Sequence, residues 1–260
     1  IHLIDAVEKI IKSFSEKFKS ITINRSQINL TGGTNQRRGI SKVLENNETV
    51  ISLEDDIYVS KYFLSYMNKA LKIYQNEKEV WHINAFNYPV HINRDFECFF
   101  MRAMKCWGWA TWNDRWSKFN ADPLSCDPYY LKTLFSKEMV QDFDLNLNRS
   151  LFWSQIEKNA TGNLNNTWDI FWYSFIFLNK GLCLTPKVSL TRNIGHDGSG
   201  IHSGFDRELL DSIISHKDVS NFPDVIKENV YCLIQIKKYL KRKNNIYSKL
   251  KRKFLILKHY

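Results

Sequence analysis

The sequence predicts an α/β fold whose central sheet is mostly parallel and flanked by helices. Three observations support this class. The chain has 260 residues, with 43% apolar and 14% aromatic side chains, which is the composition of a globular protein with a substantial core. Residues 49–53 form an unbroken apolar and β-branched run, typical of a strand buried on both faces. A patterned helix and a second strand follow that run, and such alternation favours parallel pairing.

The N-terminal part is predicted to alternate between short elements. Residues 3–18 carry apolar side chains at spacings of three and four, which indicates an amphipathic helix. Residues 19–25 are predicted to form a short strand. A turn-rich loop with two adjacent glycines is then expected over residues 26–39, followed by a short helix over residues 40–48.

The remaining elements follow from periodicity and capping signals. Ser60 is predicted to cap a helix over residues 60–80, and residues 80–87 are predicted to form a strand. A further helix is expected over residues 167–181, and a strand from residue 182 runs into a loop rich in Gly, His and Ser. We therefore expect one large domain over residues 1–226 and a basic amphipathic tail over residues 227–260.

The net charge of +10 is confined to that tail. Residues 227–260 contain eleven Lys or Arg and one acidic residue, so the rest of the chain is balanced. This distribution argues against a nucleic-acid-binding groove across the fold. A tail that mixes cations with Leu, Ile, Tyr and Phe is typical of peripheral contact with an anionic membrane, although a solvated terminal helix would have the same composition.

The cysteines and apolar runs indicate the cellular setting. The five cysteines are odd in number and include no C-x-x-C pair, which argues against a disulfide framework or a zinc knuckle and favours a reducing, cytoplasmic location. No apolar run is long enough to predict a membrane-spanning helix, and the first residues lack the features of a signal peptide. The protein is expected in the cytoplasm or on the inner face of the cell membrane.

Three consecutive carboxylates, Glu54, Asp55 and Asp56, follow the apolar run at residues 49–53. Like charges at the end of a buried strand repel one another and lose hydration, unless a cation is present. Mg²⁺ and Mn²⁺ prefer such oxygen ligands and complete their coordination with water and substrate phosphates. The alternative is that the acids cap the next helix, whose N-terminus favours negative charge.

These residues carry a resemblance to a known fold family. The segment VISLEDDIYVSKYFLSYMNKAL resembles the Asp-x-Asp region of GT-A glycosyltransferases, in particular the N-acetylglucosaminyltransferase I family and related bacterial, family 2-like sugar transferases. Three further segments resemble that family in the same order: CWGWATWNDRW, WDIFW and TPKVSLTRNIGHDGSGIHSGFD. The resemblance covers roughly residues 20–206. It implies a GT-A fold that lacks its first N-terminal strand, since that strand would precede residues 3–18.

The resemblance implies a role for each acid. Asp56 would bind the Mn²⁺ or Mg²⁺ ion that bridges the donor's diphosphate, and His202 would be a further metal ligand. Glu54 and Asp55 would orient the nucleotide or hold the metal's waters. A metal that neutralises the charge of a nucleoside-diphosphate leaving group needs no proton transfer.

Asp169 is the candidate general base, because an inverting transfer needs a carboxylate beside the acceptor hydroxyl. The family pattern has two successive acids after the Trp, whereas this chain has Asp169 and then Ile170. The alternative is that Asp169 caps the helix that starts near Trp168.

Two segments are predicted to contact the substrates. The loop with His196, Asp197 and Ser199 contains several glycines, and in similar enzymes such a loop closes over the donor and excludes water. Arg25 and Asn29, with the segment through Gly33, Arg37 and Arg38, correspond to a donor-contacting region, and Arg is suited to phosphate. The segment TGGTNQ lacks the Gly-Lys-Ser/Thr ending of a P-loop, which argues against an ATPase.

The aromatic segment 98–116 holds four of the eight tryptophans. Trp109 and Trp112 are predicted to lie in the cleft and stack on an acceptor sugar, whereas the others are assigned to packing.

Together these features predict a metal-dependent, inverting glycosyltransferase in bacterial surface polysaccharide synthesis. It would move a hexosyl or N-acetylhexosaminyl group from a nucleotide-sugar donor to a glycan or lipid-linked acceptor. The alternatives are a non-catalytic glycan- or membrane-binding module, and a nucleotidyltransferase, which also uses acidic strand ends with Mg²⁺.

Overall fold

The computed structural model describes residues 2–162, 167–198 and 205–244, and the chain divides into two units, residues 1–31 and 32–260. The first unit contains helix α1 (His2–Ser13) and the short helix η1 (Ser15–Lys17). Residues 19–25 form no strand, so the predicted strand there is wrong. Arg25 of this unit donates from Nη1 to Asp5 Oδ1 at 2.9 Å.

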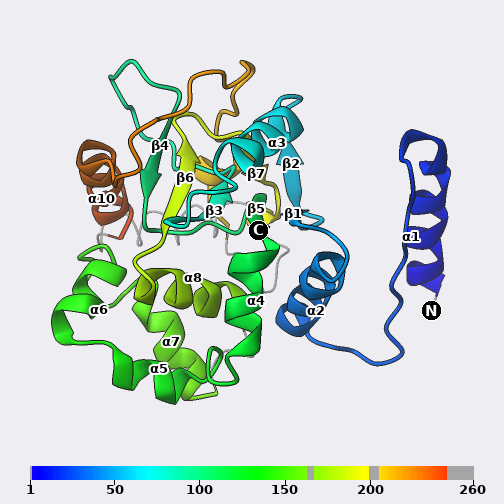
Figure 1. Cartoon of the computed structure of the whole chain (residues 1–260), viewed down its shortest axis with the longest axis horizontal. Coiled ribbons are helices and arrows are strands. Elements are labelled where there is room, and N and C mark those ends of the chain that lie inside the picture. Colours follow the sequence, from blue (N-terminus) through cyan, green and yellow to red (C-terminus); the bar gives the residue numbers. More distant parts are fainter. Residues whose placement is uncertain (1, 163–166, 199–204, 245–260) are drawn as a thin grey trace. The chain divides into compact units, whose positions relative to one another are not determined.

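The second unit is built on a five-stranded mixed sheet in the order β1-β5-β3-β6-β4 (Figure 1). The strands are β1 (Thr49–Ser52), β3 (Val80–Asn84), β4 (Cys98–Met101), β5 (Trp109–Trp112) and β6 (Leu182–Pro186). The α/β class is confirmed, but the expectation of mostly parallel pairing is wrong. Only β3 and β6 pair in parallel among the described strands, whereas β1–β5, β3–β5 and β4–β6 are antiparallel.

The physical reason lies in the position of β5. Strands β1 and β3 run in the same direction, as expected for strands joined through a helix, because each is antiparallel to β5. Strand β5 follows the edge strand β4 in the sequence and lies between β1 and β3 in the sheet. The sequence shows the alternation but does not show which strand fills the gap.

Alternation along the strands divides the core into two layers. In β4, Cys98 and Phe100 pack on the side of helix α3 (Phe63–Ile73), whereas Phe99 and Met101 pack on the opposite side. Because successive side chains of a strand point to opposite faces, a sheet covered on both sides must be apolar throughout. This explains why β3, β4, β5 and β6 are buried at every position.

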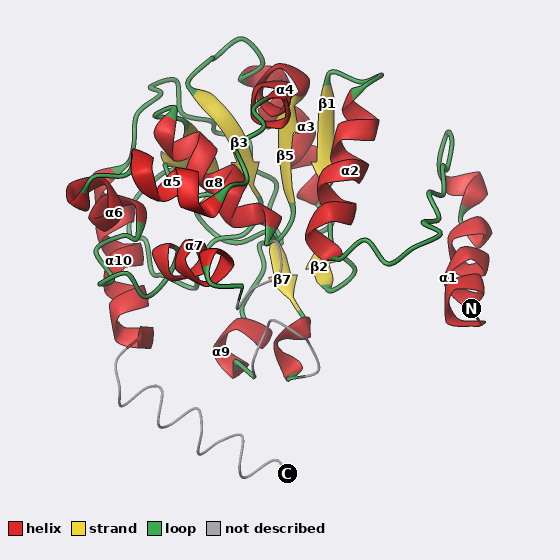
Figure 2. Ribbon diagram, turned by 90° about the horizontal axis from the view of Figure 1, so that it is seen from below, coloured by secondary structure: helices red, strands yellow, loops and turns green. Residues whose placement is uncertain are grey.

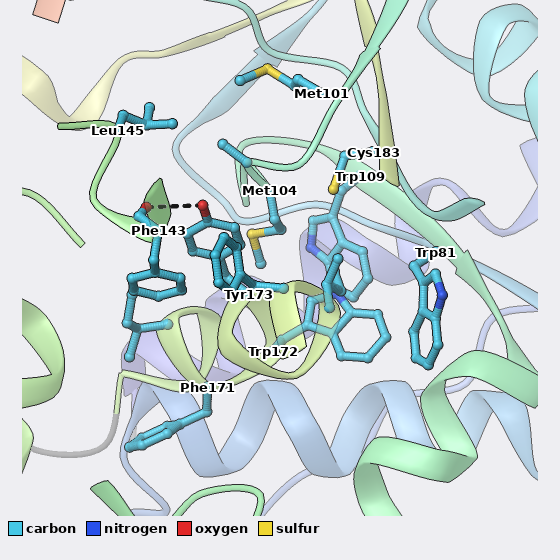
Figure 3. Close-up of a cluster of buried hydrophobic side chains, with 14 of the residues drawn as sticks. Trp81, Met101, Met104, Trp109, Phe143, Leu145, Phe171, Trp172, Tyr173 and Cys183 are labelled. Atoms are coloured by element: carbon cyan, nitrogen blue, oxygen red, sulfur yellow. Dashed lines mark hydrogen bonds between the residues drawn. The ribbon is translucent and has the colours of Figure 1, made fainter. Parts of the chain in front are cut away.

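The layer opposite α3 is dominated by aromatic residues (Figure 3). It is centred on helix α8 (Trp168–Leu178), whose Tyr173 donates a hydrogen bond to the carbonyl of Phe143 at 3.0 Å. Around α8 lie α4 (Asn113–Ala121), α5 (Pro128–Leu134), α6 (Lys137–Phe143), α7 (Trp153–Ala160) and α10 (Val230–Asn244) (Figures 1 and 2). Offset and edge-to-face contacts between these rings stabilise the layer beyond area burial.

Two helices begin at places that differ from the sequence predictions. Residues 26–39 were expected to form a loop, but α2 (Gly32–Leu44) begins at the glycine pair and lies beside β1 (Figure 2). It buries Ile40 and Leu44, and this packing outweighs the low helix propensity of glycine. Helix α3 begins at Phe63 instead of Ser60. The Ser60 hydroxyl donates to the Ser215 carbonyl at 2.6 Å instead of capping the helix.

Helix α10 occupies part of the predicted basic tail. It buries Cys232, Ile236, Tyr239 and Leu240 against the body of the protein, so its apolar face is already covered. Further along the same face, Lys243 pairs with Asp206 at 2.8 Å. Membrane contact through the tail therefore depends on residues 245–260, which lie outside the described residues, and it stays a prediction. None of the described helices has the length and apolar run that crossing a bilayer requires.

Candidate active site

The acidic run forms a turn between two strands. After β1, the amide of Ile57 donates to the Glu54 carbonyl at 3.2 Å and begins strand β2 (Ile57–Val59). Glu54 and Asp56 are partly buried, and Asp55 is exposed. Because β2 and a turn separate the acids from the start of α3 at Phe63, they do not cap that helix. The helix-cap alternative is thereby excluded.

A two-stranded ribbon brings the glycine-rich loop to Asp56. Strand β2 pairs antiparallel with β7 (Thr191–Asn193), so the start of one lies beside the end of the other. The amide of Ile194 donates to the Asp56 carbonyl at 2.8 Å. A Cβ on Gly195 would lie 2.6 Å from Asp56 Oδ2, a separation that real Cβ atoms do not adopt. A larger residue at this position would therefore force the carboxylate or the loop to shift.

The helical turn η2 (Gly195–Asp197) packs His196 against Trp107. Their ring centroids are 5.0 Å apart in an edge-to-face arrangement. Thr191 Oγ1 donates to the Trp107 carbonyl at 2.7 Å, which fixes the backbone that precedes β5. Gly108 has φ +78°, and a Cβ there would lie 2.9 Å from Thr191 Cγ2, so this turn also requires glycine. His196 thus lies two residues after the backbone contact with Asp56, with a partly buried Trp beside it, and its role in the site stays a prediction.

Asp169 lies in the first turn of α8, and Thr167 occupies the N-cap position. Asp169 lies close enough to the acidic turn for its negative charge to raise the pKa of both Glu54 and Cys106. Burial is the largest cause that raises the pKa of the Cys106 thiol, followed by the charges of Asp169 and Glu54. The thiol therefore stays protonated and forms a hydrogen bond with the Asp169 carboxylate.

Negative charge is crowded here without a basic partner for the acidic run. Burial, and then the charges of Asp56, Asp169 and Asp55, raise the pKa of Glu54 to about 7. Within the described part of the chain, no Lys or Arg forms an ion pair with Glu54, Asp55 or Asp56. The arrangement raises the electrostatic free energy of the folded protein, and a bound cation would lower it.

One oxygen is suited to such a cation. Asp56 Oδ1 is buried and has no hydrogen-bond partner among the described residues, although buried polar atoms are normally paired. The described residues contain no group of three His, Cys, Asp or Glu side chains that could hold a metal by themselves. A site with one protein carboxylate still suits Mg²⁺ or Mn²⁺, which keep several waters and bind substrate phosphates. The residues present therefore fit a metal that arrives with a diphosphate.

The predictions for Trp109 and Trp112 are corrected by the structure. Trp109 has no exposed surface and stacks between His82 at 4.9 Å and Trp168 at 5.2 Å. Trp112 is 3% exposed, on the other face of β5, where its Nε1 donates to the Leu71 carbonyl at 3.1 Å. Both rings are held inside the core because they lie within a strand that is buried on both faces, so neither can stack on a sugar.

The structure does not test the roles predicted for the other residues. Asp197 is exposed in η2. Ser199 and His202 lie outside the described residues. Arg25 and Asn29 belong to the separate unit of residues 1–31, and their role in donor binding stays a prediction.

Sequence reasoning missed Trp107 and Cys106. Both are partly buried and lie in the loop that leads into β5. The signal was present, since Gly108 breaks the aromatic run and marks where the strand starts. Residues before that glycine belong to the strand end at the site, whereas Trp109 and Trp112 belong to the strand itself.

Residues 41–150 match the family model described as glycosyltransferase family 25 (LPS biosynthesis protein). The match supports a glycosyltransferase. It spans less than half of the chain, from α2 through β1, the acidic turn and β5 to α6, and ends before Asp169. No curated protein matches the sequence. The closer resemblance to the N-acetylglucosaminyltransferase I family and the GT-A assignment stay predictions.

Proposed function

We propose that this protein is a metal-dependent glycosyltransferase that moves a sugar from a nucleotide-sugar donor to an acceptor hydroxyl with inversion. The observation that carries the proposal is the meeting of the acidic turn, the start of α8 and the Gly195 loop at one end of the sheet. The match to a family whose description names lipopolysaccharide biosynthesis supports a role in bacterial surface polysaccharide synthesis.

On this proposal Asp56 is the metal-binding carboxylate, and Mn²⁺ or Mg²⁺ would be held between it and the donor's diphosphate. When bound, the metal neutralises charge on the leaving nucleoside diphosphate. Glu54 and Asp55 hold the metal's waters or the nucleotide ribose. His202 is proposed as a further ligand. The loop that carries His196, Asp197 and Ser199 covers the donor and excludes water, which would otherwise compete with the acceptor.

Asp169 is proposed as the general base. It accepts the proton of the acceptor hydroxyl while that oxygen attacks the anomeric carbon from the face opposite the leaving group. The Cys106 thiol, which is protonated and hydrogen-bonded to Asp169, orients the carboxylate. A carboxylate that accepts a weak thiol hydrogen bond keeps lone pairs for the acceptor. Cys106 is thus a positioning residue.

The acceptor is proposed to be a glycan or lipid-linked hydroxyl, and the transferred group a hexosyl or N-acetylhexosaminyl unit. We place the enzyme in the cytoplasm or on the inner face of the membrane, with contact made through the C-terminal tail. The charge distribution in the sequence supports this placement, because the cations are concentrated beyond residue 226.

The proposal is tested by measuring hydrolysis and transfer over a panel of nucleotide sugars, with Mn²⁺ and with EDTA. The wild type should turn over at least one donor only with the metal. Asp56→Asn, which keeps the side-chain shape but removes the charge, should lower the rate by about a hundredfold or more. Lys132→Asn on the exposed side of α5 is the control. Turnover that ignores both EDTA and the Asp56 substitution would refute the mechanism, and sugar binding without turnover would favour a glycan-binding module.

A further inference from the structure

A polar cavity lies along α2, where α2 contacts α4 and α8. Its volume is about 520 Å³. The cations Arg37, Arg38 and Lys42 of α2 line one side, and Trp168 and Phe171 of α8 form an apolar floor. Neither the acidic run nor the residues that contact Asp56 line it, so this cavity is distinct from the metal-binding carboxylate.

The described lining residues of the cavity include more cationic than anionic side chains. Glu45 is the single acidic side chain among the described lining residues, against three cations. The Arg37 guanidinium lies 5.1 Å from the Phe119 ring centroid, which holds it in place. Its Nε is buried and has no hydrogen-bond partner in the described residues. A buried donor of this kind is costly, so the cavity is arranged for an anion.

The position of the cavity indicates which substrate would occupy it. Trp168, in its floor, directly precedes the proposed base Asp169. At the other side, Gln36 of α2 donates to Ser52 Oγ at 2.7 Å, two residues before Glu54. A molecule in the cavity would therefore contact the residue that precedes the proposed base, and the base acts on the acceptor. The donor's diphosphate, by contrast, is assigned to Asp56, which contacts the Gly195 loop. This assignment departs from the sequence-based expectation that Arg37 and Arg38 contact the donor.

We infer that this cavity binds the acceptor, and that the acceptor carries an anionic group held by Arg37, Arg38 and Lys42. The identification of the ligand as the acceptor rests on the proposed function, whereas the inference that the cavity binds an anion does not. Guanidinium groups bind phosphate and carboxylate through paired N–H donors, and both groups occur on sugars. The substrate class is therefore an acidic glycan or a phosphorylated one.

The test is calorimetric titration of the full chain with four probes: a neutral hexose, a hexose 6-phosphate, a hexuronate and inorganic phosphate. The charged sugars should bind at least tenfold more tightly than the neutral hexose, and binding should weaken as salt is raised. Tighter binding of the 6-phosphate than of the hexuronate identifies a phosphorylated acceptor, and the reverse order identifies an acidic sugar. If no charged probe binds, or if the neutral hexose binds equally, the inference is overturned.

Variants locate the binding. Arg37→Gln should weaken the charged sugars by tenfold or more, and Arg38→Gln with Lys42→Gln, both exposed and free of core packing, should do the same without lowering the melting temperature. Lys72→Gln with Lys132→Gln, which lie on α3 and α5 outside the cavity, should leave affinity unchanged. Equal affinity in the cavity variants and this control would refute the assignment.

Titration with UDP and Mn²⁺ separates the inference from the proposed function. Asp56→Asn should lose nucleotide binding, whereas the cavity variants should keep it. If the cavity variants lose UDP binding instead, the cavity belongs to the donor and the inference is wrong. If the wild type binds the charged sugars but neither binds nor hydrolyses any nucleotide sugar, the proposed function fails while the anion site stands.

Discussion

Two polar clusters at the sheet differ in how well their groups are satisfied. The first consists of the His82 and Asn84 side chains in β3, which are buried and whose polar atoms are all hydrogen-bonded: Asn84 donates to Thr185 Oγ1 at 2.8 Å and accepts from the Lys105 amide at 2.7 Å. The second, the acidic turn, has a raised pKa at Glu54 and an unpaired oxygen on Asp56. A structural cluster completes its own bonds, whereas a binding site leaves them for a ligand.

The His82 ring shows how complete the first cluster is. Trp172 Nε1 donates to His82 Nδ1 at 3.2 Å, so Nδ1 is an acceptor and Nε2 carries the proton. Nε2 then donates to the Lys105 carbonyl at 3.1 Å. Burial lowers the pKa of His82 to about 3, because no room or partner is left for a second proton. The acidic turn has the opposite character, since an added cation would relieve it.

The largest expected effect is at the acidic site. Asp169→Asn should lower kcat by about a hundredfold to ten-thousandfold, since an amide cannot accept the acceptor's proton. The melting temperature should stay the same or rise, because a repelling charge is removed. Steady-state kinetics and thermal unfolding on one preparation give both values. A variant that loses stability together with activity would show that Asp169 is structural. Asp142→Asn, at an exposed position of α6, is the control for general loss of charge and should leave kcat unchanged.

The second effect is at the satisfied cluster. Asn84→Leu should lower the free energy of unfolding by about 2–4 kcal/mol, because it leaves the Lys105 amide and the Thr185 hydroxyl unpaired in the core. Urea unfolding measures the change. Asn68→Leu, whose amide is exposed on α3 and donates to the Leu64 carbonyl, is the matched control and should change stability by well under about 1 kcal/mol. Similar losses in both variants would contradict the contrast.

The third effect is a pH dependence at His82. Its folded-state pKa of about 3 lies below the unfolded value of 6.5, so the unfolded chain takes up a proton first as the pH falls. Stability from this group is complete above pH 6.5 and decreases below it, by about 1.4 kcal/mol between pH 7.5 and 5.5. Urea unfolding at both pH values measures this loss of stability. The variant His82→Gln, which has no titrating imidazole, is the reference. A wild type and a variant with the same pH slope would contradict it.

The smallest effect is a gain. In EDTA at pH 8, Glu54→Gln should raise the free energy of unfolding by up to about 1 kcal/mol, because it reduces the repulsion within the acidic turn. Saturating Mn²⁺ and UDP should remove this advantage, since the wild type then gains a counterion. Paired urea curves with and without ligand measure both values. A loss of stability in EDTA would place Glu54 with the structural groups.

The sequence predicted what depends on local pattern and missed what depends on packing between distant segments. The strand at residues 49–52 and the buried face of α3 follow from the run of apolar residues and from their periodicity. The start of α2 at Gly32 was missed, because its stability comes from Ile40 and Leu44 meeting the body of the protein.

The candidate site shows the same division. The charge pattern pointed to the acidic run as a metal site or a helix cap, and the roles of Glu54 and Asp56 stay predictions. The choice of Trp109 and Trp112 as cleft residues was wrong, because both are buried in the core, whereas Trp107 is partly buried beside His196. Deciding between these rings requires knowing that β5 is inserted between two strands and is covered on both faces. That insertion is a long-range property, and no spacing within the aromatic segment encodes it.

The ribbon of β2 and β7 has a mechanical consequence. Because the Ile194 amide is bonded to the Asp56 carbonyl, the backbone that follows β7 is tied to the backbone of Asp56. A donor that orders the loop should therefore also help to order Asp56. The entropy cost of ordering the two is then smaller than the sum of the costs for two independent segments. Loop closure and metal binding should then be linked reciprocally, each increasing the affinity for the other through a ribbon only three residue pairs long.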